Sequence, residues 1–299
     1  YILKIAEENN ITKAAEKLFI TQSALNQQLL KLEKELGTPL FHRSRTNWRL
    51  TEAGEIYIEG AKAALQIKNT TYNRIYDVVS ARKGHLTIGL TPGRGLRMFT
   101  AIYPELHRSF PNLDVRPIEM RVRAQQDAIA KGEIDVGLMT LARRDQTSDT
   151  YYPLKQEELV LIIPAGHPLA EKAAPSGEPL ATLDLTELRY EPFVLMDKTS
   201  TLRSSCDLLF EKAGFAPNIL FETNNTSGIA AMVQSTLCCG IIPRYYTLGL
   251  TEGVACFSLP ERPSWEIVIS CQKNAYLNSG AREFIRLARE YWENSAPLF

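Results

Sequence analysis

Apolar residues near the start of the chain recur at steps of three and four, the period of an amphipathic helix. Thr12 is a good N-cap residue, and the small and apolar residues after it predict a short first helix. After a break at residues 19–20, Thr21 offers a second N-cap, and a spaced series of leucines predicts a longer helix: Leu25, Leu29, Leu32 and Leu36. Gly37 ends this second helix. Two helices joined by a tight break predict a helix-turn-helix.

The outer face of the second helix carries side-chain amides, hydroxyls and an ammonium group. In a helix-turn-helix, such groups near the start of the second helix hydrogen-bond to base edges in the major groove. An ordinary helical hairpin with a solvated polar face is the alternative interpretation. The candidate DNA-contact residues, including the N-cap, are Thr21, Gln22, Ser23, Asn26, Gln27 and Lys31.

A short basic stretch follows, between apolar residues at 40–41 and the Leu-Thr pair at 50–51. It carries Arg43, Arg45 and Arg49, and the pattern predicts a small hairpin, or wing, beside the helix pair. Guanidinium groups on such a wing would meet DNA phosphates or the minor groove.

One long helix is predicted from Glu52 to about Arg82, because this stretch contains no proline. Residues along it follow steps of four and three, close to a heptad seam, and most are apolar: Ala61, Leu65, Tyr72, Ile75 and Val79. Such a seam needs a partner, which is either a second copy of the chain or the body of the same chain. We favour the dimer, although Lys68 also falls on the seam and would have to extend toward solvent.

The rest of the chain alternates predicted strands and helices. The first strands cover residues 85–91, 113–120 and 134–139, with helices at about 96–110 and 124–131, which predicts a parallel α/β sheet. A second set is inserted near 155–263, and a strand at 265–272 and a helix at 279–292 follow it. This arrangement predicts two lobes with a cleft between them, and ligands of such sheets bind beyond the carboxyl ends of the strands.

Residues 91–95, Thr-Pro-Gly-Arg-Gly, follow the first predicted strand of the body. Gly93 and Gly95 form half of a dinucleotide-binding fingerprint, but no third glycine follows at the required position. Two interpretations stay open: a helix N-terminus whose free N–H groups, with Arg94, hold an anion, or a turn that requires glycine.

Composition and charge add two constraints. A chain of 299 residues, of which 44% are hydrophobic, supports two or three folded domains. The net charge is zero, but up to Thr87 there are 13 Lys and Arg against 9 Asp and Glu, and beyond it 21 against 25. A basic front and an acidic back fit a nucleic-acid-binding head on a body with another task.

The cysteines and other local patterns limit the kinds of site that we expect and indicate the cellular compartment. The five cysteines all follow residue 205, which favours free thiols in a cytoplasm over a disulfide framework. No Cys or His spacing predicts a metal site and no nucleophile-base pattern predicts catalysis, so we expect neither a catalytic residue nor a cofactor. No apolar run is long enough to span a membrane. Tyr1 stands where Met is expected, so we expect a few residues to be missing before it.

Several short motifs resemble those of LysR-type transcriptional regulators. In the first 54 residues these are ITQSALNQQLLKLEKELG, LGTPLF and LTEAG, in the family's order and spacing. In the body they are KGHLTIG, FPNL, GEIDVGL and GIIP. The head departs from the usual pattern at Asn26, Gln27 and Trp48, which affects the preferred DNA sequence rather than DNA binding itself.

The resemblance implies an α+β multidomain fold. It places a winged helix-turn-helix at residues 1–53, a linker and dimerisation helix at 54–82, and a two-lobed α/β effector domain, similar to periplasmic binding proteins, at 83–299. Lobe I would comprise about 84–155 and 264–299, and lobe II about 156–263. It also implies a bacterial homodimer or homotetramer on double-stranded promoter DNA, with a small-molecule coinducer in the cleft that changes DNA bending.

The family's coinducer contacts fall at the ends of the predicted strands. Its usual hydroxyl positions are occupied here by Gly93 and Val122, so we hypothesise that arginine and backbone N–H groups recognise a small organic anion instead. A solvated surface is the alternative for Arg121 and Arg123. The candidate effector-binding residues are Thr91, Gly93, Arg94, Arg121, Val122, Ser200, Thr201, Thr226 and Ser227.

Three other functions are less consistent with the same residues. Some members of the family sense peroxide through a cysteine, but the comparable position here is Thr201, and nearby Cys206 is predicted to be buried and inert. A transport-like binding protein is disfavoured by the missing export signal and by the polar helix face. An enzyme is disfavoured by the missing catalytic constellation.

Overall fold

The computed structural model describes residues 1–44, 48–79, 82–175, 177–250 and 252–295. Contacts divide the chain into a first unit, residues 1–81 with 131–133, and a second unit, residues 82–130 with 134–299. Each unit has its own buried hydrophobic residues, in one cluster in the first unit and in further clusters in the second. None of the helices among the described residues is both long and apolar enough to cross a membrane.

The first unit is a winged helix-turn-helix followed by a long helix. Its elements are α1 (Ile2–Glu8), α2 (Ile11–Lys17), α3 (Gln22–Leu36), the antiparallel hairpin of β1 (Phe41–His42) and β2 (Arg49–Leu50), and α4 (Glu52–Val78). The sequence patterns did not predict α1. Leu25 and Leu29 of α3 are fully buried, whereas Leu36 is exposed, so the apolar face of α3 is shorter than its leucine series.

Capping explains where the helices of the first unit begin and end. The Thr21 side chain accepts a hydrogen bond from the N–H of Ala24, and Gly37 ends α3 with a φ of 71°, so both predicted caps of α3 are confirmed. The prediction of Thr12 as the first N-cap is wrong. Asn10 caps α2, because its side chain accepts from the N–H groups of Thr12 and Lys13.

The second unit contains a mixed sheet in the order β10-β6-β11-β5-β3-β4, with β9 paired to β6. β3 is parallel to β4 and β5, as predicted, whereas β11, β6, β9 and β10 pair antiparallel, so the sheet as a whole is not parallel. The sequence patterns missed β10. The strands are β3 (Lys83–Leu90), β4 (Asn112–Glu119), β5 (Val136–Leu141), β6 (Thr150–Pro164), β9 (Gly240–Pro243), β10 (Val254–Ser258) and β11 (Ser264–Cys271).

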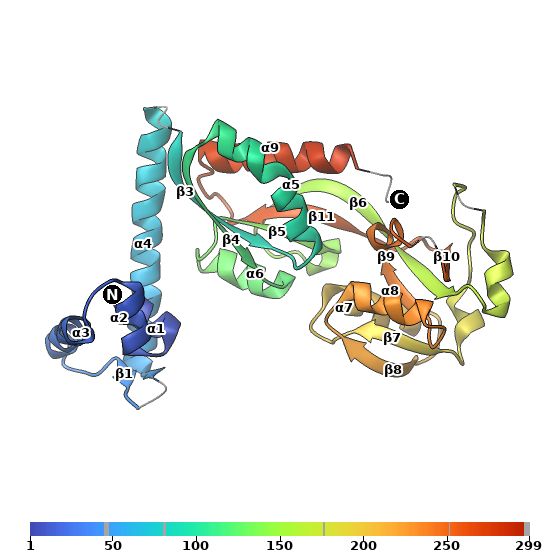
Figure 1. Cartoon of the computed structure of the whole chain (residues 1–299), viewed down its shortest axis with the longest axis horizontal. Helices are drawn as coiled ribbons and strands as arrows, with labels where there is room; N and C mark the ends of the chain where they lie inside the picture. The colour runs from blue at the N-terminus through green and yellow to red at the C-terminus, as the bar shows by residue number, and fades with distance from the viewer. Residues whose placement is uncertain (45–47, 80–81, 176, 251, 296–299) are drawn as a thin grey trace. The chain divides into compact units, whose positions relative to one another are not determined.

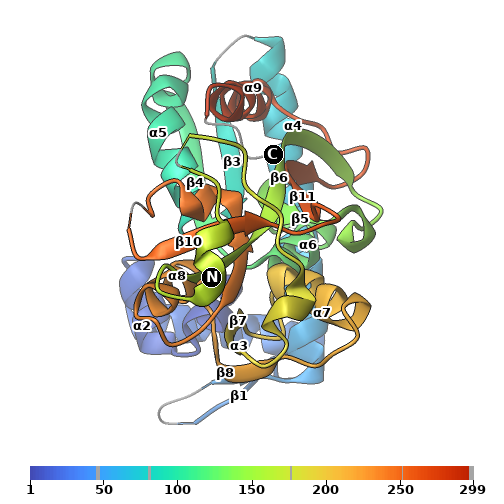
Figure 2. The ribbon, with the colours of Figure 1, turned by 90° about the vertical axis from the view of Figure 1, so that its right-hand side faces the viewer.

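Two lobes share strand β6, which is long enough to enter both. Its first part pairs with β11 in lobe I, and its second part pairs with β9 and β10 in lobe II. In lobe I, α5 (Arg94–Ser109) and α9 (Ser279–Glu293) pack side by side, and α6 (Val122–Ala130) packs on β5 (Figure 1). Lobe II adds the parallel pair β7 (Pro192–Met196) and β8 (Asn218–Thr223) with α7 (Thr201–Lys212) and α8 (Thr226–Gln234) on either side of β7 (Figure 2).

Candidate functional site

The polar face predicted on the second helix lies on α3. Gln22, Ser23, Gln27 and Lys31 are exposed, and Asn26 is half-buried. The Gln22 side-chain oxygen accepts a hydrogen bond of 3.1 Å from the Thr12 hydroxyl, which orients the amide and leaves its NH₂ group for another acceptor. The residues expected to contact DNA therefore share one solvent-facing helix surface.

The wing is fixed by a buried carboxylate of α3. Glu33 accepts a hydrogen bond of 2.8 Å from the N–H of Leu40 and pairs with Arg43, whose guanidinium lies 5.5 Å from the Trp48 ring centre. Arg43 is therefore already partnered inside the first unit, whereas Arg49 on β2 is exposed. Arg45, the third predicted wing arginine, lies outside the described residues.

The second unit contains a cavity of about 720 Å³ between its lobes. Much of its wall is built from the segments that follow the carboxyl ends of β3 and β4 in lobe I and of β7 and β8 in lobe II, where α5, α6, α7 and α8 begin. The segment after β9, with Tyr245 and Tyr246, and Trp265 of β11 also contribute to it. Ligands of open α/β sheets bind at such strand ends. All nine predicted effector-binding residues line this one cavity, and contact with a ligand remains a prediction for each. Arg123 is exposed and is not among the lining residues.

The charged residues lining the cavity are three arginines, Arg94, Arg97 and Arg121, and no Asp or Glu lies among the described lining residues. Arg94 forms the floor of the cavity and is 7% exposed. It pairs with fully buried Glu157 and lies within 6 Å of three ring centres, those of Tyr245 at 5.3 Å, Tyr246 at 5.6 Å and Trp265 at 5.9 Å.

Glu157 is fully satisfied, because it also accepts hydrogen bonds from the Trp265 indole N–H at 2.7 Å and from the Tyr245 backbone N–H at 2.9 Å. The charge of Arg94 is therefore neutralised within the fold.

The turn before Arg94 requires glycine. Gly93 has a φ of 72° and a ψ of −82°, and the Arg94 N–H donates to the Pro92 carbonyl at 2.9 Å, which closes a three-residue γ-turn that is strained for other residues. The Gly95 N–H donates to the Thr91 carbonyl at 3.0 Å. The glycine turn is therefore present, and these two N–H groups are already bonded within it, while anion binding at this helix N-terminus stays a prediction.

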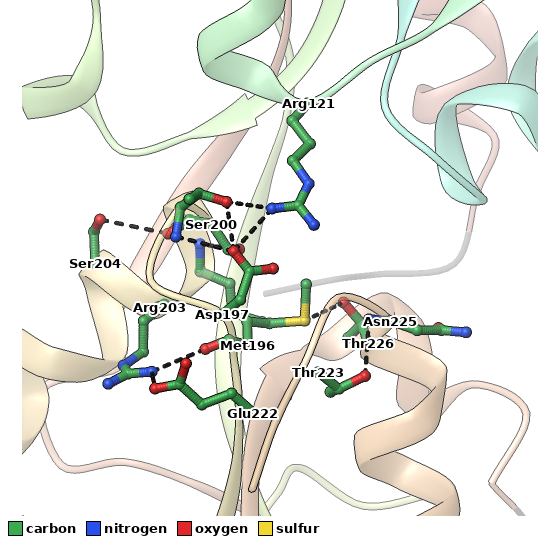
Figure 3. Close-up of polar contacts among 12 residues, drawn as sticks. Arg121, Met196, Asp197, Ser200, Arg203, Ser204, Glu222, Thr223, Asn225 and Thr226 are labelled. Atoms are coloured by element: carbon green, nitrogen blue, oxygen red, sulfur yellow. Dashed lines mark hydrogen bonds and ion pairs between the residues drawn. The ribbon is translucent and has the colours of Figure 1, made fainter.

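Arg121 forms part of the rim of the cavity (Figure 3). Its Nη1 donates to Asp197 Oδ1 at 2.8 Å and to the Thr199 hydroxyl, across the gap between lobe I and lobe II. The pKa of Asp197 is lowered, because the hydrogen bonds from Thr199 and Arg121 outweigh the burial that opposes ionisation. Arg121 is therefore paired with lobe II although its side chain is 45% exposed, and its contact with a ligand stays a prediction.

Sequence reasoning missed several residues that line the cavity. Arg97 is exposed and makes no ion pair within the described part of the chain, and its spacing of three from Arg94 on one helix was the available signal. Tyr246 had no such signal. Burial raises the pKa of its phenol, which keeps the hydroxyl protonated and able to donate.

All five cysteines are free. Burial raises the pKa of Cys206 to about 12, so its thiol is protonated at neutral pH, and the prediction of a buried residue is confirmed. In the described ranges, no three His, Cys, Asp or Glu side chains gather in a way that would hold a metal ion.

Comparison with protein families assigns both units. Residues 1–55 match the family described as bacterial regulatory helix-turn-helix protein, lysR family, and residues 80–293 match the LysR substrate binding domain. Among curated relatives, an uncharacterised HTH-type transcriptional regulator of Bacillus subtilis, YcgK, is 29% identical, with 97% of this chain and 92% of the relative covered.

Solved structures share the fold at lower identity. Full-length CbnR in complex with its target DNA has a TM-score of 0.66 and 20% identity over 97% of both chains. The effector binding domain of QuiR in complex with shikimate has a TM-score of 0.58 and 18% identity, covering 71% of this chain and 98% of that domain.

Proposed function

Because the chain belongs to the LysR family of transcriptional regulators, we propose that α3 contacts promoter DNA and that a small organic anion in the cavity changes the bend of that DNA. The observation that carries the ligand class is the lining of the cavity, which includes three arginines and no Asp or Glu among its described residues. Arg94 and Arg121 are paired with Glu157 and Asp197, which are not lining residues, and Arg97 makes no ion pair within the described part of the chain. A ligand carboxylate would find charge-assisted donors in Arg97 and in the Nη2 and Nε groups of Arg121, which Asp197 and Thr199 do not use.

On the DNA side, the proposal assigns base contacts to Gln22, Ser23, Asn26 and Gln27, and phosphate contacts to Lys31 and Arg49. Amides and hydroxyls on the first turns of α3 support this division, as does the exposure of Arg49 on the wing. Thr21 keeps its capping role. Arg43 is given the task of holding the wing, since its guanidinium already pairs with Glu33.

The proposal includes dimerisation through α4, because this helix exposes large apolar side chains along its length. Val78 is 85% exposed, Ile67 is 70% exposed and Ile56 is 68% exposed. The predicted seam residues Leu65, Tyr72, Ile75 and Val79 are exposed as well. A second copy of the helix would cover such a surface, and a symmetric dimer presents two heads to paired half-sites.

Salt-dependent retention of duplexes from the protein's own genomic neighbourhood tests the DNA assignment. The wild-type chain should bind with an affinity that falls steeply as salt rises. Arg49→Gln should weaken binding to every duplex and reduce the salt slope by about one, whereas Gln22→Ala should cost about 1–3 kcal/mol on the preferred sequence only. Arg123→Gln, which changes an exposed arginine of the second unit, is the matched control. Absence of any retention at low ionic strength would overturn the assignment.

Thermal melting with matched ligand pairs tests the charge of the coinducer. Shikimate, the ligand in the QuiR structure, is one suitable probe, with its neutral methyl ester as partner. Acids that bind should raise the melting temperature and their esters should not. Stabilisation by neutral esters alone would contradict an anion site.

A further inference from the structure

The ion pair of Arg121 and Asp197 joins the two lobes directly at the rim of the cavity (Figure 3). Arg121 follows β4 of lobe I, and Asp197 follows β7 of lobe II. Among the ion pairs of the described residues, this one joins a strand-to-helix loop of lobe I to a strand-to-helix loop of lobe II, and neither partner lies on the shared strand β6. Two hydrogen bonds also join the lobes directly, from the Thr201 hydroxyl to the Thr140 carbonyl at 3.1 Å and from Arg144 Nη2 to the Ser205 hydroxyl at 3.0 Å. Whatever occupies the Arg121 guanidinium therefore affects one of several direct polar contacts between the lobes.

The acceptor side of this contact is held in place by lobe II. The Asp197 N–H donates to the Thr223 carbonyl at 2.8 Å, and the Thr199 N–H donates to Asp197 Oδ1 at 3.0 Å. One residue earlier, the Met196 carbonyl accepts from buried Arg203 at 3.0 Å, and Arg203 in turn pairs with Glu222. Asp197 is thus a fixed carboxylate at the end of β7.

The donor side is less constrained. The Arg121 side chain is 45% exposed, and a single nitrogen, Nη1, serves both Asp197 and Thr199. Its Nη2 and Nε have no hydrogen-bond partner among the described residues. Arg121 thus has unused donors beside the cavity, and its exposed ion pair is weak enough to be exchanged.

We propose that Arg121 recognises the anionic group of the ligand, and that Asp197 occupies its guanidinium until the ligand arrives. The inference rests on the proposed anion site. A ligand carboxylate offers the guanidinium the same acceptor geometry that Asp197 offers. Arg94 is unsuited to this exchange, because Glu157 and three aromatic rings hold it in the floor. Arg97 makes no contact with Asp197, so an anion bound there would leave the lobe contact intact.

Distances between the lobes test the lobe contact without any ligand. Spin labels at Asp127→Cys on α6 and Glu211→Cys on α7 use exposed positions, in full-length protein with the partly buried Cys256 changed to Ser. Arg121→Gln and Asp197→Asn should each broaden and lengthen the distance distribution, and Arg123→Gln should leave it unchanged. An unchanged distribution in Arg121→Gln would overturn the lobe contact.

Titration with inorganic phosphate tests the exchange, followed by the fluorescence of Trp265, which lines the cavity. Asp197→Asn removes the internal competitor, so it should reach half-saturation at up to about fivefold lower phosphate than the wild type. Arg121→Gln should require more phosphate for half-saturation. In the Arg97→Gln background, Asp197→Asn should still lower the half-saturating phosphate concentration, because Arg97 does not contact Asp197. Equal titrations of Asp197→Asn and the wild type, or no response in either, would overturn the exchange.

These outcomes are separable from those of the proposed function. If the distances and titrations fail while duplex retention and stabilisation by organic acids persist, Arg121 is not the recognising group and the regulator assignment stands. If duplex retention fails, the distance result still decides the lobe contact, because it is measured without DNA.

Discussion

Two arginine–carboxylate pairs flank the cavity, one in its floor and one at its rim. In the floor pair, Arg94 is 7% exposed and Glu157 is fully buried, and aromatic rings and further donors surround both. In the rim pair, the side chains of Arg121 and Asp197 are 45% and 25% exposed. The same chemistry therefore serves two purposes. Burial makes the floor pair a permanent part of the fold, while access to water leaves the rim pair open to exchange.

The largest effect is expected from breaking the floor pair. Glu157→Gln keeps the volume and one acceptor but leaves Arg94 buried without a counter-charge, which should reduce the free energy of unfolding by about 3–5 kcal/mol. Asp197→Asn at the rim should cost less than about 1 kcal/mol. Urea unfolding followed by the fluorescence of Trp265 and Trp292 measures both losses. Similar losses in the two variants would refute the distinction between floor and rim.

A smaller loss is expected from the turn that delivers Arg94 to the floor. Gly93→Ala should cost about 2 kcal/mol, because the backbone angles at Gly93 are unfavourable for any residue with a Cβ. A clash is not the reason, since the nearest atom to an added Cβ is the Tyr246 hydroxyl oxygen at 4.0 Å. Unfolding measurements on Gly93→Ala should therefore show the loss, and Gly166→Ala, which adds a Cβ in open space at an ordinary φ, is the control.

A pH-dependent effect is expected at Glu158, which lies beside Glu157 on β6. Burial opposes its ionisation, but the hydrogen bond and charge of Arg262, with the charge of Arg244, lower its pKa below the ordinary 4.5. A lowered folded-state pKa gives stability that is complete above pH 4.5 and is lost as the pH falls through the folded pKa.

The stability difference between wild type and Glu158→Gln should therefore be constant above pH 4.5 and shrink below it. Asp197→Asn should show the same sign, because the pKa of Asp197 is also lowered. Urea unfolding across this pH range gives both curves. A difference that grows on acidification would contradict the ion-pair assignment.

The smallest effect, no change at all, is expected at Cys206. This thiol lies on α7, one turn beyond its start, and its pKa of about 12 leaves almost no thiolate at neutral pH. If Arg121→Gln and Asp197→Asn break only the ion pair at the rim, both variants should leave the alkylation rate of Cys206 unchanged. In a second measurement, peroxide should leave duplex binding equal in wild type and Cys206→Ser. Faster alkylation in the rim variants would show that they loosen α7 as a whole.

Local sequence patterns predicted much of the fold. The leucine spacing and the caps at Thr21 and Gly37 located α3, because helix period and capping depend on neighbouring residues. The cap at Asn10 was missed, because Thr12, two residues later, is also a favourable N-cap residue. Strand β10, Val254–Ser258, was missed as well.

For the cavity too, some features could be predicted from the sequence and others depend on the tertiary structure. The family resemblance supplied the nine candidate cavity residues, and they share one cavity because they follow the carboxyl ends of strands, which the order of strands and helices along the chain predicted. Only the tertiary structure decided which arginine is neutralised. Glu157 lies 63 residues from Arg94, and Asp197 lies 76 residues from Arg121. Local periodicity cannot predict such partners. Which charges pair depends on how distant segments pack, and the strength of the pair depends on how much water that packing excludes.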